Sequence, residues 1–248
     1  MLLKTKGIVI KQIKYSDSGV IVKIYTEELG VLSFFVRGLR SRKPARPTAG
    51  PRNKAAMFQP LTMLELVISY SENKSLHSIN EVSVWYSYQS ITENMIKRTL
   101  LFFINEVLYK CLKEETENKE LFDWIHKALV WLDLADKDFV NFHLVFMMHF
   151  SMFLGFYPKK KPSENHTVFD LQEGRFCNNL PVHPYYVTGE TARLLSKIQE
   201  TKFEDSDKLN INNKNRKIIL ETLITYYSIH MPAIGEFKSL DVLSVVLS

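Results

Sequence analysis

The first 85 residues alternate apolar and polar positions with a period of two, and this pattern predicts β-strands. Turn residues such as Asp17-Ser18-Gly19 separate the segments. The five expected strands are Lys6–Tyr15, Gly19–Thr26, Val31–Gly38, Gln59–Tyr70 and Ser75–Trp85. Five antiparallel strands with the longest connection between the third and the fourth are typical of an OB-fold, a small Greek-key barrel. An SH3-like barrel would show the same pattern, so the strands alone leave both folds open.

From about Tyr88 the apolar period changes to near 3.6, which predicts helices. The six expected helices are Thr92–Lys113, Lys119–Leu134, Lys137–Phe156, Thr188–Glu200, Lys214–His230 and Ser239–Leu247. Thr92 and Asn94 are rival N-caps for the first of these helices, and Asp136 is the expected N-cap of the third.

Residues 158–187 are irregular and poor in apolar residues, with a small hairpin expected around Glu173-Gly174. The pattern therefore predicts an α+β multidomain chain. We expect an OB-fold barrel over residues 1–85 and a helical domain over residues 86–248, with the loop-rich insertion 158–187 inside it.

Composition places the chain among ordinary globular proteins, with 46% hydrophobic and 24% charged residues. The start reads directly into a strand pattern, so we expect no secretion signal. The most apolar window, Phe139–Phe156, contains Asn141 and two histidines and predicts a buried helix rather than a membrane span. Cys111 and Cys177 lie far apart, which argues against a disulfide framework and for a cytoplasmic protein with free thiols.

One stretch, Val36–Met57, carries the positive excess of the chain. The chain has 32 Lys and Arg against 27 Asp and Glu; this stretch holds seven of the 32 and no acid, so the rest has 25 against 27. The seven cations are Arg37, Arg40, Arg42, Lys43, Arg46, Arg52 and Lys54. Its prolines exclude a regular helix or inner strand. An extended cationic loop beside a folded domain would bind a phosphate backbone, and the alternative is a solvated loop without a partner.

Motifs of catalytic chemistry are absent from the sequence. It has no GxxxxGK[ST], GxGxxG, GxSxG or HExxH pattern. His143 and His149 are six residues apart and fall on different helix faces, so they cannot hold one metal ion together. The acidic run around Asp133 lacks EF-hand spacing and is better explained by capping and solvation. These absences argue for a binding protein rather than an enzyme.

Three segments, in order along the chain, resemble the RecO family of bacterial recombination and repair mediators. They are GIVIKQIKYSDSGVIVKIYTEELGVLSFFVRGLRSRK, FQPLTMLELVISYSENKSLHSINEVSVW and FLGFYP. The resemblance is strong over the first 85 residues and thinner afterwards. It implies an OB-fold followed by a helical domain.

The sequence departs from the family at its zinc site, where many members carry two C-x-x-C pairs after the L-G-F-x-P segment. Here Lys159–Asn165 contains no cysteine, and Cys177 stands alone in its half of the motif. His166, Cys177 and His183 supply three ligands at best, and tetrahedral zinc needs four. We therefore expect a degenerate zinc-finger-like insertion with the zinc site lost, and no cofactor.

The resemblance implies a non-enzymatic mediator that binds single- and double-stranded DNA, anneals strands, and with RecR helps to load RecA on DNA coated by single-strand-binding protein. The acidic C-terminal tail of that protein would dock in a cationic pocket of the helical domain, for which Lys159–Lys161 and the pair Arg193 and Lys197 are weak guesses. The alternatives are an OB-fold interaction module whose basic loop docks an acidic protein, and a nuclease with a scattered site.

Beside the basic loop, the strand pattern adds four candidate DNA-binding residues. OB-type barrels hold phosphates in a cationic groove and stack bases on aromatic rings. Lys23 and Tyr25 share the outward face of the second strand, and Phe35 and Arg37 share that of the third. The alternative for Tyr25 and Phe35 is packing against the helical domain.

Overall fold

The computed structural model describes residues 1–15, 19–37, 54–113, 116–137, 139–159 and 167–247. The chain divides into two compact units, and each is considered by itself. The first comprises Met1–Gln89 and Asn105–Lys127, and the second comprises Ser90–Ile104 and Ala128–Ser248. The boundary passes within two helices, so that each of these helices contributes residues to both units. The domain limits expected from the sequence stay predictions.

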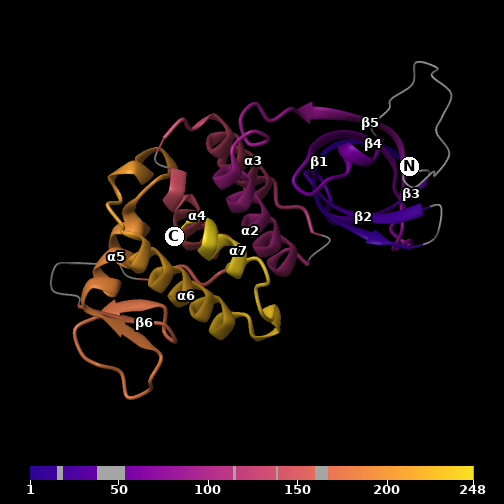
Figure 1. Cartoon of the computed structure of the whole chain (residues 1–248). Coiled ribbons are helices and arrows are strands. Elements are labelled where there is room, and N and C mark those ends of the chain that lie inside the picture. The colour runs from indigo at the N-terminus through magenta and orange to yellow at the C-terminus, as the bar shows by residue number, and fades with distance from the viewer. Residues whose placement is uncertain (16–18, 38–53, 114–115, 138, 160–166, 248) are drawn as a thin grey trace. The chain divides into compact units, whose positions relative to one another are not determined.

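The first unit contains a five-stranded antiparallel sheet that curves into a ring (Figure 1). Its strands are β1 (Leu2–Lys14), β2 (Gly19–Thr26), β3 (Gly30–Arg37), β4 (Met63–Ser69) and β5 (Ser78–Tyr86). The order is β3-β2-β1-β4-β5, and the short helix α1 (Lys54–Met57) lies in the β3–β4 connection.

The two ends of this sheet meet at one parallel bridge between Phe34 and His77, which precedes β5. The sheet can close into a barrel because the long strand β1 pairs with β4 through its first half and with β2 through its second half. A register shift between Val9 and Lys11 marks the bend between those halves. This Greek-key order is that of an OB-fold, and the predicted fold class is confirmed.

The inward face of the barrel holds the alternate apolar residues that the sequence pattern predicts. Val22, Ile24, Phe34 and Leu66 are fully buried. Gly7 of β1 is required by this packing, because a Cβ there would lie 2.5 Å from Cγ2 of Ile24.

The helices are α2 (Met95–Cys111), α3 (Lys119–Leu134), α4 (Phe142–Phe153), α5 (Gly189–Glu200), α6 (Asn213–His230) and α7 (Leu240–Val246). Each corresponds to a predicted helix, and α3 has the predicted bounds. Asn94, one of the two rival caps, accepts a bond from the Lys97 N–H at 3.1 Å. The expected cap Asp136 is wrong: a 3₁₀ turn over Phe139–Asn141 intervenes, and α4 begins after Asn141.

The second unit also contains a small sheet, β6 (Val168–Asp170), β7 (Arg175–Cys177) and β8 (Tyr186–Thr188), in the order β7-β6-β8. The β6–β7 hairpin confirms the predicted turn, where Gly174 has φ +61°. Strand β8 was not predicted. Across the parts of the chain that the structure describes, no helix combines the length and the apolar character needed to cross a membrane.

Candidate nucleic-acid interface

The outward face of β1, β2 and β3 carries two cross-strand rows that the register aligns. One row is Ile13, Ile21 and Phe35, and the neighbouring row is Lys11, Lys23 and Ser33. Residues of one face two positions apart lie about 6.6 Å apart along a strand. An apolar row and a row with two lysines are therefore adjacent on this face.

Aromatic rings and a guanidinium gather at the β3 end of the apolar row. Tyr15 is 64% exposed and meets Phe35 edge to face, with ring centroids 5.9 Å apart. The guanidinium of Arg37 lies 5.6 Å from the Phe35 ring centroid. The structure therefore brings together Phe35 and Arg37, two of the candidate DNA-binding residues from the sequence, and places Tyr15 beside them. Sequence reasoning missed Tyr15, although its position two residues after Ile13 indicates the same face.

The lysine row belongs to a wider cationic cluster within the first unit. Lys11 Nζ lies 3.7 Å from the ring centroid of Tyr109 in α2. A hydrogen bond from Lys11 lowers the pKa of Tyr109, and the charges of Lys11, Lys23 and Lys110 act in the same direction. Lys23 is thus one of several cations that could face an anion on this surface.

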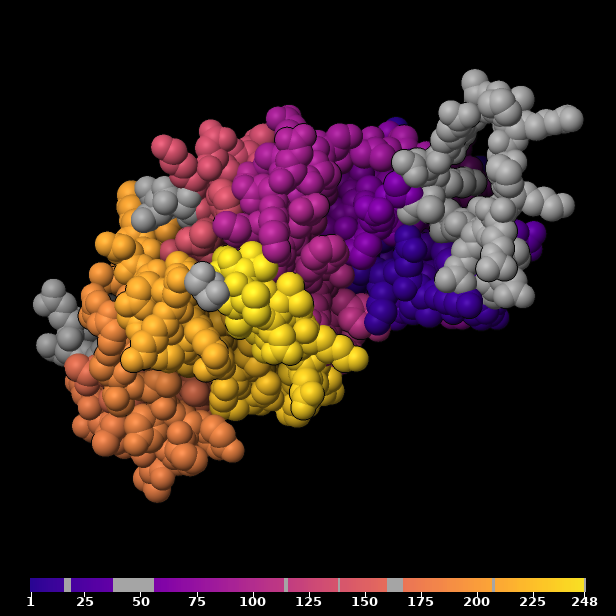
Figure 2. All heavy atoms as spheres, in the orientation of Figure 1, coloured from indigo at the N-terminus to yellow at the C-terminus, as the bar shows by residue number. Residues whose placement is uncertain are grey.

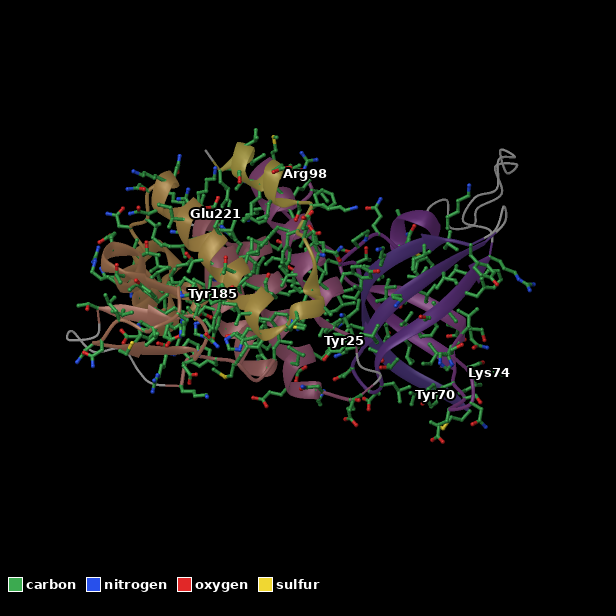
Figure 3. The ribbon with its side chains drawn as sticks, turned by 90° about the horizontal axis from the view of Figure 1, so that it is seen from below. Tyr25, Tyr70, Lys74, Arg98, Tyr185 and Glu221 are labelled. Carbon is green, nitrogen blue, oxygen red and sulfur yellow. The ribbon has the colours of Figure 1, made fainter. Side chains whose placement is uncertain are left out.

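Tyr25 requires a correction, because the structure withdraws its ring from solvent. It is 2% exposed, packs at 5.7 Å from the ring of Phe122 in α3, and donates its hydroxyl proton to the Asn118 carbonyl at 3.2 Å. Burial raises the pKa of its hydroxyl. Figure 3 shows Tyr25 at the side wall of the barrel. The packing alternative therefore describes Tyr25, and stacking of a base on this ring is wrong.

A groove of about 780 Å³ opens between the end of β3, α1 and β5. Phe35 and Arg37 line it from β3, and Met57 lines it from α1. The basic stretch is covalently joined to both of these elements. Five of its predicted contacts lie outside the described residues: Arg40, Arg42, Lys43, Arg46 and Arg52. Lys54 is the first residue of α1.

The described residues of the degenerate zinc-finger-like insertion do not form a metal site. Cys177 Sγ contacts the Asn179 carbonyl at 3.3 Å, and His183 Nε2 lies 3.3 Å from a carboxylate oxygen of Asp170. Within the described residues no three His, Cys, Asp or Glu side chains gather into a metal site. His166 lies outside those residues.

The second unit has a separate pocket of about 230 Å³ between α4, α6 and α7. Its lining combines cations with apolar side chains: His143, Asn213, Lys214, Arg216, Lys217, Leu220, Leu243, Ser244 and Leu247. Figure 2 shows α7, in yellow, at the surface of this unit. Lys214 and Lys217 are exposed at the pocket, and no acidic residue is among the lining residues that the structure describes.

Two buried polar groups lie at this pocket, and one of them, Arg216, adds positive charge. Arg216 is 8% exposed, and in the described part of the chain its hydrogen bonds go to uncharged oxygens, including Asn141 Oδ1 at 3.0 Å and Asn213 Oδ1 at 2.7 Å. His143 is fully buried, and neither ring nitrogen has a hydrogen-bond partner among those residues. Burial and the charge of Arg216 lower the pKa of His143 to about 3, so its ring is neutral at pH 7.

Of the residues that the sequence suggests for a tail-binding site, Lys159, Arg193 and Lys197 do not line this pocket. Arg193 forms a two-contact ion pair with Glu190, at 2.9 and 2.5 Å, so its guanidinium already has a carboxylate partner. Lys159 is exposed, and its backbone N–H donates to the Gly174 carbonyl. Lys160 and Lys161 lie outside the described residues.

Comparisons with known proteins cover nearly the whole chain. Residues 1–88 match the family model "Recombination protein O N terminal", and residues 93–241 match "Recombination protein O C terminal". The chain is 36% identical over 248 residues to the DNA repair protein RecO of Phocaeicola vulgatus, with all of both chains covered. It is also 36% identical to the protein of that name from Flavobacterium psychrophilum, again over all of both chains, and 25% identical to that from Porphyromonas gingivalis, over 99% of each.

Proposed function

The chain belongs to the RecO family of DNA repair proteins, which are non-enzymatic recombination mediators, and from this we propose that it binds single- and double-stranded DNA and anneals complementary strands. The observation that carries the proposal is the outward face of β1–β3. There the side chains of Phe35, Tyr15 and Arg37 lie next to the row that contains Lys11 and Lys23. The basic stretch begins at this end of β3.

This arrangement supports binding without chemistry. The cations of residues 36–57 would neutralise phosphates of either a single strand or a duplex, and release of counterions supplies the affinity. Phe35 and Tyr15 offer ring surface on which bases of a single strand would stack. A surface that neutralises two like-charged strands lowers their mutual repulsion, and this is how binding would favour annealing.

Membership of the RecO family also supports a proposal about protein partners, although the structure contains none of them. We propose that the chain works with RecR in the cytoplasm, at the nucleoid, and helps RecA to load on DNA covered by single-strand-binding protein. These steps rest on membership of the family.

A strand-annealing assay tests the proposed function. We expect the protein to accelerate pairing of complementary oligonucleotides that are coated with the cognate single-strand-binding protein, without cleaving labelled DNA in the presence of magnesium. Cleavage would favour the nuclease alternative. Absence of both annealing and DNA binding at low salt would favour the protein-interaction alternative.

For the acidic tail of single-strand-binding protein, we propose the pocket between α4, α6 and α7. A tail of this kind presents carboxylates, and Lys214, Lys217 and the buried Arg216 supply positive charge around an apolar floor. Among the described residues the Arg216 guanidinium has no carboxylate partner, and an anion in the pocket would offset the cost of burying its charge.

Charge reversal at the pocket tests this placement. Lys214→Glu combined with Lys217→Glu is expected to weaken binding of a tail peptide at least tenfold, because two attractive charges become repulsive. Fluorescence anisotropy with the labelled peptide measures the change. The control is Lys127→Glu with Lys202→Glu, which changes the net charge equally at exposed positions that do not line the pocket. Equal losses in both variants would reject the pocket in favour of a general charge effect.

A further inference from the structure

The strand β5 has one edge without a regular strand partner in the described structure. It is the last strand in the order β3-β2-β1-β4-β5. The backbone pairing with β3 that the structure describes at this end of the sheet is the bridge at His77, whose N–H donates to the Ser33 carbonyl at 2.9 Å and whose carbonyl accepts from the Phe35 N–H at 3.0 Å. Beyond this bridge, the backbone of β5 borders the groove described above.

The register of β4 tells which backbone groups of β5 face that groove. Met1 and Tyr70 exchange both of their backbone hydrogen bonds, so the backbone groups of Tyr70 point toward β1. The β1–β4 register is regular, and backbone groups alternate in direction along a strand. Those of Glu65, five residues earlier, therefore point toward β5, where Glu65 is paired with Ser83.

It follows that the backbone groups of Ser83 point toward β4, and that those of its neighbours Val82 and Val84 point toward the groove. The N–H and C=O groups of two alternate residues are thus presented along an edge. This is the spacing at which an added strand forms its hydrogen bonds.

The side chains at this edge are also incompletely covered. Val84 lies opposite Leu64 in the β4–β5 register, so both side chains are on the inward face of the barrel. Leu64 is fully buried, whereas Val84 is 42% exposed. The groove is lined here by further apolar side chains, among them Ile79, Met57 and Phe58.

We propose that this groove is a docking site for an extended segment of a protein partner, which adds as a strand to the edge of β5 that has no regular strand partner among the described residues. Its backbone pairs with Val82 and Val84, and alternate apolar side chains cover Val84. Such strand addition combines main-chain hydrogen bonds with pockets for every second side chain. This inference goes beyond the proposed DNA-binding function and does not depend on it.

Charge selects the partner further. Arg37 is the cation among the described lining residues, and the basic stretch is joined to the groove on both sides, so the fitting segment has acidic residues next to its apolar ones. A nucleic acid fits the β5 side of the groove less well, because Ile79, Val82 and Val84 offer it neither a charge nor an aromatic face, whereas Phe35 and Arg37 belong to β3.

The probe is a fluorescein-labelled peptide of alternating valine and threonine with two aspartates at each end, added to the full chain. We expect saturable binding by anisotropy, and slower amide exchange at Val82 and Val84. Val84→Asp should weaken binding at least tenfold, and Val245→Asp, at a 74% exposed valine of α7, should leave it within twofold. A peptide with proline in place of every second threonine should not bind, since it lacks the N–H groups for pairing.

Three outcomes would overturn the proposal. The first is that the peptide fails to bind. The second is that Val84→Asp weakens binding of an oligo(dT) strand rather than of the peptide, which would assign the groove to DNA. The third is that the amides of Val82 and Val84 are already protected in a dimer of the protein alone, which would make a second copy the occupant. Oligo(dT) binding is measured in parallel, so a failure here is distinguishable from a failure of the DNA-binding proposal.

Discussion

Replacing Arg40, Arg42, Lys43 and Arg46 together by glutamine is expected to weaken binding of single-stranded DNA by about two to three orders of magnitude at 0.1 M salt. At 1 M salt the variant and the parent protein should bind almost equally. The reason is counterion release: each phosphate contact on a single strand contributes about −0.7 to the slope of log K against log salt. Binding titrations at four or five salt concentrations measure both slopes.

The slopes of log K against log salt test the role of the basic stretch more directly than the affinity at one salt concentration. If about five cations of the basic stretch contact phosphates, the parent slope is about −3.5, and loss of four contacts leaves about −0.7. A matched control replaces four exposed lysines elsewhere, Lys74, Lys127, Lys202 and Lys238, and removes the same charge. An unchanged slope in the first variant, or an equal flattening in the control, would mean that the basic stretch does not hold the phosphates.

Local patterns were sufficient to predict the elements that this interface is built from. Alternation placed Phe34 inside the barrel and Phe35 outside it, and the structure agrees. The apolar period gave the bounds of α3 without error. Capping was less certain, because Asp136 and Asn141 both precede the same helix and only the 3₁₀ turn between them decides where it begins.

The sites themselves depend on contacts that no local pattern contains. Tyr25 has the alternation of an outward-facing residue, and its burial follows from Phe122, nearly a hundred residues later. The pocket of the second unit is assembled from His143, Arg216 and Leu247 on three helices or their ends. Its cations are unremarkable in sequence, because what sets them apart is their convergence on a pocket with no acidic residue among its described lining.

The adjacent residues Phe34 and Phe35 allow stability and binding to be separated in one strand. Phe34→Ala is expected to destabilise the first unit by about 3–5 kcal/mol, because a fully buried ring at the bridge to His77 leaves a cavity. Phe35→Ala removes a partly exposed ring and should cost roughly 1 kcal/mol or less. Urea unfolding followed by tryptophan fluorescence measures both, since two of the three tryptophans, Trp85 and Trp124, lie in this unit.

Binding should show the reverse order. A stacked base contributes about 1–3 kcal/mol to binding. Phe35→Ala is therefore expected to weaken the binding of single-stranded DNA by about fivefold to 150-fold, under conditions in which the variant is folded. Its effect on a duplex should be smaller, because paired bases are not available to stack on the ring. Phe34→Ala should leave the affinity of the folded fraction nearly unchanged. If Phe35→Ala changes the affinity for neither single-stranded nor duplex DNA, the rings on the outward face contribute only to packing. The phosphate contacts of the basic stretch must then account for DNA binding by themselves.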